Sequence, residues 1–382
     1  MKIKKDRVDY YISFAVFIQS FLIILQQAMI SILGMDAEAT TIYRVLSSAG
    51  FMSLAILFSF LRNKKIFIFT YSVAFLIIIL NMIFFPENEV YLKREAFRFL
   101  LPMVISSALC LMTVQSIAIV EKALYHVSWL TFGAVLVYAL FYLRGAFIID
   151  SYNMGFSYGC LLPMVSLYRH KSKLSLLAVL FLFLIVVAIG SRGAVMVFLA
   201  YVLYDVFSIN IKLFLLLFFT TMIAIGFINP LVEWLMSLGI NSRTLVLLME
   251  GEAFQDSGRG DIYNLVASAL DENLLGLGLF ADRTLLNGVY SHNMILEMLV
   301  NWGIIPMMFF FSIALVQIIL LFLKSNKCNK NRLVCYTLVL IGPLMASGSY
   351  LIDPNFGIYC GIFYLMSKNN KLERVYNLKC EF

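Results

Sequence analysis

The sequence predicts an all-α protein: a polytopic transmembrane helical bundle of about 12 spans, with the N- and C-termini cytoplasmic and one large outer loop containing short helices. Of its 382 residues, 62% are hydrophobic and only 13% are charged, whereas soluble chains carry about 25% charged residues. Hydrophobic runs of about 20 residues recur along the chain, and each is long enough to cross the hydrocarbon core as a helix. Too few polar residues remain to cover a soluble domain of this size, so lipid must cover much of the surface.

The N-terminal segment starts as a signal peptide does, with Lys2, Lys4 and Lys5 ahead of an apolar run. That run, residues 10–33, is too long for the core of a signal peptide and has no small-residue cleavage site, so we expect it to be the first span. All six cysteines lie in predicted spans or on the predicted cytoplasmic side. A disulfide framework is therefore not expected.

The spans follow one another without a fixed-period repeat or a low-complexity linker, which predicts a single membrane domain over residues 1–382. The first six are predicted at 10–33, 43–61, 66–85, 97–119, 124–142 and 153–168. The second six are predicted at 174–190, 194–208, 211–229, 294–323, 333–350 and 354–367. The tenth is long enough to tilt or to extend beyond the bilayer, and the last is short enough to be only half inserted.

The distribution of basic residues predicts the orientation. With both ends inside, the inner side carries 20 of the 29 basic residues, as the positive-inside rule requires. The net charge of +7 is then mainly a topology signal, and we expect no nucleic acid as a partner.

The outer side carries one lysine and eight arginines: Lys93, Arg44, Arg94, Arg98, Arg144, Arg192, Arg243, Arg259 and Arg283. Arginine binds phosphate through a planar, bidentate fork and stays charged when partly dehydrated. Two interpretations stay open. Translocation tolerates few outer lysines, or the outer surface is built to hold a phosphorylated ligand.

The large outer loop, residues 230–291 between spans nine and ten, is the one long hydrophilic segment. It holds eight acidic residues against three arginines, and its irregular backbone must lie in water or line a cavity between helices. Residues 261–270 have a helical apolar stripe of Ile262, Leu265, Val266 and Ala269. The stripe fits either a helix at the membrane surface or an ordinary packed loop helix.

Two arginines are candidate anion-binding residues. Arg192 lies in a Gly-Ser-Arg-Gly turn between two short apolar spans, which would recess its charge at the outer edge of the hydrocarbon. A charge at that depth is either functional or snorkels to the headgroups. Arg259 opens the loop helix, where free N–H groups also favour an anion.

His292 is the only one of the three histidines on the outer side, at the point where the loop re-enters the membrane. Its unperturbed pKa suits proton transfer near neutrality, although a lone histidine is more often structural. Ser291 could cap the helix that follows. Glu297 lies one turn beyond Asn293 and could orient a neighbour or pair with an arginine. We expect Arg283, Asn293 and Glu297 to bind substrate.

Motifs of other enzyme classes are missing: no phosphate-binding Walker sequence, no His-Glu-x-x-His and no Gly-x-Ser-x-Gly occurs. No Cys/His set has zinc spacing, and the outer carboxylates have no coordination pattern. The sequence therefore predicts no metal and no cofactors.

In order and topology, the motifs of residues 150–310 resemble the O-antigen polymerase (Wzy-type) and ligase (WaaL-type) superfamily of bacterial integral membrane glycan-assembly enzymes. The resemblance is carried by short sequences arranged around one loop: Gly190-Ser191-Arg192-Gly193-Ala194, Ser257-Gly258-Arg259, Gly276-Leu277-Gly278, His292-Asn293-Met294-Ile295-Leu296-Glu297 and Gly303-Ile304. The first half of the chain resembles the family only in its span pattern.

The resemblance implies a metal-independent glycosyltransferase with its active site on the outer face of the bacterial inner (cytoplasmic) membrane. Its substrates would be polyprenyl-diphosphate-linked oligosaccharides, and a flippase and a chain-length regulator would be further partners. Arg192 and Arg259 would hold the diphosphate, and His292 would accept or direct the proton of the acceptor hydroxyl.

Three alternatives to a polysaccharide polymerase of the O-antigen or capsule type stay open. A ligase would move the glycan onto the lipid A core of lipopolysaccharide. A flippase or other transporter would show paired halves with ionisable or broken helices near the midplane, and no such symmetry is found. A scaffold of an export complex would leave Arg192 and His292 unexplained.

Overall fold

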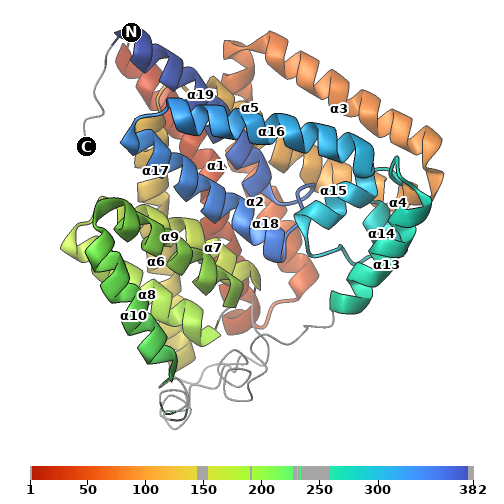
Figure 1. Ribbon diagram of the computed structural model, residues 1–382. Coiled ribbons are helices and arrows are strands. Elements are labelled where there is room, and N and C mark those ends of the chain that lie inside the picture. The colour runs from red at the N-terminus through yellow and green to blue at the C-terminus, as the bar shows by residue number, and fades with distance from the viewer. Residues whose placement is uncertain are drawn as a thin grey trace. The chain divides into compact units, whose positions relative to one another are not determined.

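The structure is a computed structural model that describes residues 2–143, 154–189, 192–226, 230, 233 and 259–376. Every regular element in these residues is a helix (Figure 1). The first half contains α1 (Lys2–Leu33), α2 (Ala37–Arg62), α3 (Lys64–Phe84), η1 (Pro86–Asn88), α4 (Glu89–Glu95), η2 (Ala96–Ile105), α5 (Ser106–Thr113), α6 (Ile117–Leu143), α7 (Met154–His170) and α8 (Lys173–Ile189). The second half contains α9 (Arg192–Ile209), α10 (Ile211–Gly226), α13 (Arg259–Glu272), α14 (Ala281–Leu285), α15 (Met294–Trp302), α16 (Ile304–Lys324), α17 (Lys327–Tyr336), η3 (Thr337–Ile341), α18 (Gly342–Ala346) and α19 (Pro354–Tyr376).

Six helical segments within the described residues are long and apolar enough to cross a membrane, as expected of a membrane protein. They are Lys5–Leu33, Ala37–Arg62, Lys64–Phe84, Pro86–Thr113, Ile117–Tyr142 and Ile304–Lys324. Three further apolar helices are shorter, at Lys173–Ala188, Gly193–Ile209 and Ile211–Thr220. The all-helical class is confirmed, whereas the number of 12 spans and the cytoplasmic placement of both ends stay predictions.

Large apolar side chains project from α3 and α16 without protein cover. Phe69 and Phe84 on α3 and Leu323 on α16 are each about two-thirds exposed. Exposed apolar surface on this scale is unfavourable in water and suits contact with lipid.

The predicted tenth span, 294–323, is divided at Gly303 into α15 and α16. Gly303 has a φ of +82°, and its backbone leaves the helical path there. The membrane-length helix therefore begins at Ile304. The short helix α15, which carries the predicted Glu297, lies ahead of it.

Two other span boundaries also differ from the prediction. The predicted span 97–119 ends at Thr113, and the next helix begins at Ile117. The predicted span 333–350 ends at Ala346, where Ser347 leaves the helical conformation with φ −165° and ψ 8°. Residues 347–353 form a loop, which proves to be part of the candidate site.

The chain divides into two compact units. The first contains Met1–Val16, Ala49–Val120 and Asp256–Phe382, and the second contains Phe17–Ser48 and Glu121–Gln255. In the first unit α19 packs on α5 and η2. A Cβ atom on Gly357 would overlap the carbonyl oxygen of Val104, so glycine allows the close approach that membrane helices use for packing.

The second unit is built on α7, α8, α9 and α10, with the second half of α1, the first part of α2 and most of α6. Asp205 is buried in it and accepts hydrogen bonds from Lys171 and Tyr168, each at 3.2 Å. A buried carboxylate needs such partners because its desolvation is costly.

Candidate functional site

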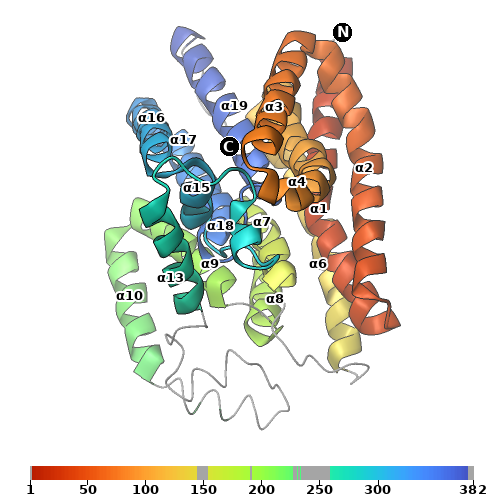
Figure 2. The ribbon, with the colours of Figure 1, turned by 90° about the vertical axis from the view of Figure 1, so that its right-hand side faces the viewer.

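The short helix α14 of the large loop lies against η1, the turn between α3 and α4, in the first unit. α13 packs on α15 (Figure 2). α14 contacts α15 and η1. The helix predicted at 261–270 is confirmed as α13. Its residues Val266 and Leu270 are buried against Ala281 and Val300, as in an ordinary packed loop helix.

The segment after α13 is held against the C-terminal end of α15 by backbone hydrogen bonds. Leu277 N donates to Val300 O at 2.8 Å, and Ile304 N donates to Leu274 O at 3.0 Å. A Cβ atom on Gly276 would lie 2.5 Å from Gly303 N. The two glycines, 27 positions apart in the sequence, are therefore needed for one close backbone contact.

Two asparagines attach this segment to the first half of the chain. Asn81 at the end of α3 accepts a hydrogen bond from Leu279 N at 2.6 Å. Asn88 donates to Leu277 O and accepts from Thr284 Oγ1, each at 2.7 Å. Their only sequence signal is an amide near the end of an apolar run, which does not reveal a partner almost 200 residues away.

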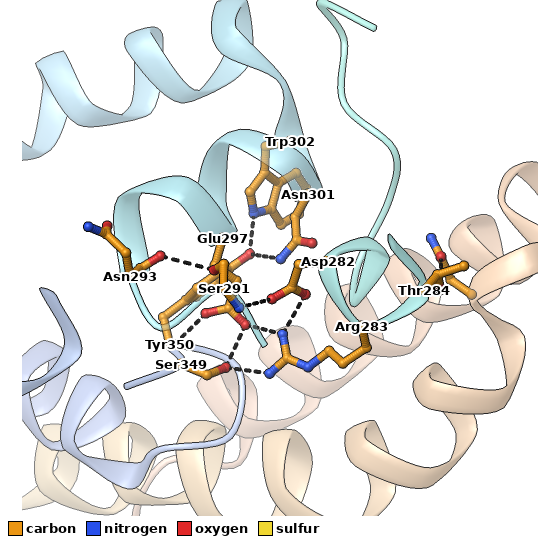
Figure 3. A network of polar contacts seen from close by, with 11 residues as sticks. Asp282, Arg283, Thr284, Ser291, Asn293, Glu297, Asn301, Trp302, Ser349 and Tyr350 are labelled. Carbon is orange, nitrogen blue, oxygen red and sulfur yellow. Dashed lines mark hydrogen bonds and ion pairs between the residues drawn. The ribbon is translucent and has the colours of Figure 1, made fainter. Parts of the chain in front are cut away.

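Arg283 on α14 is the centre of a buried charged cluster (Figure 3). Its Nη1 donates to Asp282 Oδ1 at 2.6 Å and also to Glu297 Oε1, and its Nη2 donates to Ser349 Oγ at 2.7 Å. Its guanidinium carbon lies 5.1 Å from the ring centroid of Phe280 and 5.8 Å from that of Tyr290. Burial opposes the positive charge, but the two carboxylates outweigh it and raise the pKa of Arg283.

Glu297 on α15 is the second carboxylate of the cluster. Besides Arg283, it accepts hydrogen bonds from Ser349 Oγ at 2.5 Å and from Tyr350 N at 2.9 Å. Burial raises the pKa of Glu297 to about 7, although the Arg283 guanidinium lowers it. Its predicted pairing with an arginine is confirmed, and the partner is Arg283.

The loop 347–353 closes the cluster from the other side. The hydroxyl of Tyr350 accepts hydrogen bonds from Asn301 Nδ2 at 3.0 Å and Trp302 Nε1 at 2.8 Å (Figure 3). Burial raises the pKa of that hydroxyl. Ser349 and Tyr350 are site residues that the sequence analysis missed, because their loop was predicted as the end of a span.

His292 lies next to this cluster on the segment that leads into α15. Its ring centroid is 4.1 Å from that of Tyr290, and its side chain is half-buried. The Tyr290 hydroxyl donates to Ser347 O, and Ser291 N donates to Asp282 Oδ2, each at 2.9 Å. His292 has a φ of +54°, a left-handed conformation that non-glycine residues adopt when the surroundings hold them there.

Asn293 caps α15, which corrects the predicted cap at Ser291. The Asn293 side chain accepts from Ile295 N at 2.9 Å and from Leu296 N at 3.3 Å. Asparagine at the residue directly before the helix satisfies its free N–H groups. Ser291 lies two residues too early and donates its hydroxyl to Asn293 O instead.

The predicted diphosphate ligands are described only in their backbone. Arg192 is the first residue of α9 and Arg259 is the first residue of α13. The flanking residues 190–191 and 234–258 lie outside the described residues. The structure thus brings together His292, Asn293, Arg283 and Glu297, while the roles of Arg192 and Arg259 stay predictions.

No group of three His, Cys, Asp or Glu side chains that could hold a metal ion is found among the described residues. Asp282 and Glu297 converge, but the guanidinium of Arg283 lies between them. This carboxylate pair is therefore already occupied by a cation of the chain itself. Comparisons of the sequence with protein-family models and curated proteins, and of the structure with solved structures, found no match.

Proposed function

We propose that this chain is a polysaccharide polymerase acting on the outer face of the bacterial inner membrane. It would transfer a growing glycan from a polyprenyl-diphosphate carrier onto the next lipid-linked repeat unit. The observation that carries the proposal is the setting of His292. A half-buried histidine in a left-handed conformation stands at the end of the large loop. It follows Ser291 and packs on Tyr290, and both of these residues contact the buried charged cluster. Residues held in unfavourable backbone conformations concentrate at functional sites.

The reaction needs a base at the acceptor and positive charge at the leaving group. In this proposal His292 accepts the proton of the acceptor hydroxyl as its oxygen attacks the anomeric carbon. The bond between that carbon and the diphosphate oxygen breaks, and the carrier leaves as polyprenyl diphosphate. Charge grows on the diphosphate as this bond breaks, so cationic groups placed there lower the barrier.

Arg192 and Arg259 are the residues we assign to the diphosphate. Each is the first residue of a helix, where unpaired backbone N–H groups and the helix dipole favour an anion. Arginine adds a bidentate, permanently charged donor to that setting. A sugar diphosphate offers the matching charge and oxygen geometry.

Arg283 and Glu297 have a supporting part in this proposal. Both are buried, and their polar atoms are bound to Asp282, Ser349 and the backbone of Tyr350. Direct contact with a glycan would require them to become exposed. Asn293, which is only half-buried, remains the predicted substrate-binding residue beside His292.

The glycan profile of a deletion strain tests the proposed reaction. Single repeat units on the surface lipid or on the carrier would support a polymerase. Full-length polymer stranded on the carrier would instead indicate a ligase, and repeat units retained on the cytoplasmic face would indicate a flippase. Complementation with the wild-type chain should restore full-length polymer.

Two histidine variants locate the base. His292→Ala should fail to restore the polymer while the protein still inserts, as measured by its level in the membrane fraction. His170→Ala is the matched control, because His170 also packs on a tyrosine, with its ring centroid 4.3 Å from that of Tyr125. Normal polymer length with His292→Ala would rule out the proposed base.

A further inference from the structure

Asp282 is the member of the buried cluster whose two carboxylate oxygens bind different parts of the chain, the Arg283 side chain and the Ser291 backbone. One guanidinium, that of Arg283, faces two buried carboxylates, those of Asp282 and Glu297. Glu297 is also held by Ser349 and by Tyr350 N, so its oxygens are used within the cluster. A second buried carboxylate has a high desolvation cost, and such groups persist where their oxygens are used.

The second oxygen of Asp282 accepts a hydrogen bond from the backbone next to the proposed base. Asp282 Oδ2 accepts the hydrogen bond of Ser291 N at 2.9 Å (Figure 3). Ser291 directly precedes His292, whose φ is +54°. A left-handed conformation at a residue with a Cβ atom is unfavourable by itself. A fixed N–H group one residue earlier restricts the chain at the point where that conformation must form.

The residue before Ser291 is attached to the same cluster. The ring of Tyr290 lies under the Arg283 guanidinium and also packs against the His292 imidazole. Its hydroxyl donates to Ser347 O, two residues before Ser349 of the cluster. After His292, the side chain of Asn293 caps α15. The residues on both sides of His292 are thus held in place. On the N-terminal side, the nearest of these contacts is the hydrogen bond from Ser291 N to Asp282.

We infer that Asp282 is a positioning residue for His292: its carboxylate fixes Ser291 N and so sets the direction of the imidazole. Asp282 itself is fully buried and acts on His292 through the backbone of Ser291, while its other oxygen binds Arg283. The inference rests on the proposed function for its catalytic meaning, but the geometric part can be measured without any substrate.

The geometric test is nuclear magnetic resonance of the full-length protein in lipid nanodiscs, with isotope-labelled histidine. The chain has three histidines and therefore three histidine signals. The signal that disappears in His292→Asn is that of His292. In Asp282→Ala and Asp282→Leu the His292 signal should move or broaden, while those of His126 and His170 stay in place. The leucine variant fills the volume of the aspartate, so it carries the test if the alanine variant does not fold.

A matched control and a rescue variant separate positioning from general destabilisation. Asp9 is also a buried aspartate that pairs with an arginine, Arg62, and accepts a backbone hydrogen bond, from Gln115 N at 3.1 Å. Asp9→Ala should leave the His292 signal unchanged. Asp282→Asn should restore much of the wild-type signal, because its amide oxygen can still accept from Ser291 N.

Transfer assays with lipid-linked repeat units complete the test. Asp282→Ala should lower kcat about 100-fold, the size expected when a catalytic group is displaced by about 1 Å, with little change in KM. The kcat of Asp282→Asn should be at least about tenfold higher than that of Asp282→Ala. An unchanged His292 signal in both Asp282→Ala and Asp282→Leu would overturn the inference. A moved signal in a protein whose wild type transfers no glycan would support Asp282 as a positioning residue and contradict the polymerase.

Discussion

At the scale of single residues, the site depends on one buried cation shared by two carboxylates. Arg283 is only 3% exposed, and its hydrogen bonds reach α14, α15 and the loop 347–353. A cluster of this kind is weak evidence for stability, because desolvation offsets much of the attraction. The cluster does fix the arrangement of α14, α15 and the loop 347–353 relative to one another. Removal of one of its charged side chains leaves a buried charge without a partner.

Arg283→Met should therefore destabilise the protein by about 3–5 kcal/mol, because Asp282 and Glu297 would be left buried together without a cation. Thermal unfolding of the detergent-solubilised protein measures the loss. At alkaline pH, where Glu297 is ionised, the double variant with Glu297→Gln should be more stable than Arg283→Met, since one of the two unpaired charges is removed. Equal stability of the single and double variants would contradict the ion-pair assignment.

The pH dependence of stability should carry the signature of Glu297. Its folded-state pKa, about 7, lies above the ordinary value of 4.5, so the folded protein holds this proton over a range where the unfolded chain has lost it. The stability from the raised pKa is fully present below pH 4.5 and is lost as the pH rises toward 7. Between these values the melting temperature of the wild type should fall relative to that of Glu297→Gln. A constant difference between the two proteins over this range would contradict the raised pKa.

At the scale of elements, local patterns predicted the helices better than their ends. The apolar stripe of residues 261–270 was sufficient for α13, and the apolar run of the predicted span 294–323 was sufficient for the start of α15, although its cap was predicted at Ser291. The break at Gly303 was not predicted, because a single glycine inside a long apolar run is compatible with one continuous span. Its cause is a partner segment around Gly276, which no local pattern reveals.

Gly276→Ala tests that partner contact. The added Cβ atom would lie 2.5 Å from Gly303 N, at a residue whose φ is +87°, so the loop would be displaced from α15. Overpacking of this kind costs about 1–3 kcal/mol and should also lower the activity that depends on His292.

Gly50→Ala is the control for this variant. Gly50 lies within α2 with no atom within 4 Å of an added Cβ, so alanine there should be neutral or slightly stabilising. Similar melting temperatures for Gly276→Ala and Gly50→Ala would contradict the close contact.

At the scale of the whole molecule, composition alone predicted an all-helical chain with segments long enough to cross a membrane. Hydropathy counts apolar residues, so it did not separate the loop 347–353 from the span predicted at 333–350. The shorter apolar helices α8, α9 and α10 leave the spans predicted there as predictions. The same limit hid Ser349 and Tyr350, whose polar contacts lie inside an otherwise apolar stretch. Hydropathy also cannot predict contacts between distant parts of the sequence, such as that of Asn88 with Leu277.

The basic residues predict which side of the membrane each loop of the whole molecule faces. In a cysteine-free background, Val289→Cys should react with a membrane-impermeant maleimide in intact spheroplasts, because Val289 is exposed beside the candidate site. Lys64→Cys, at the first residue of α3 directly after the turn from α2, should react only after the membrane is opened. The opposite labelling pattern would place His292 in the cytoplasm and contradict the orientation derived from the basic residues.

The central claim is that this chain joins lipid-linked repeat units and that His292 serves the acceptor hydroxyl. The most direct measurement is polymerisation by the purified protein in liposomes that contain polyprenyl-diphosphate-linked repeat units, with products resolved by length. The wild type and His170→Ala should give a ladder of increasing length with release of polyprenyl diphosphate, and His292→Ala should leave single units. A ladder of normal length from His292→Ala, or none from the folded wild-type protein, would contradict this account.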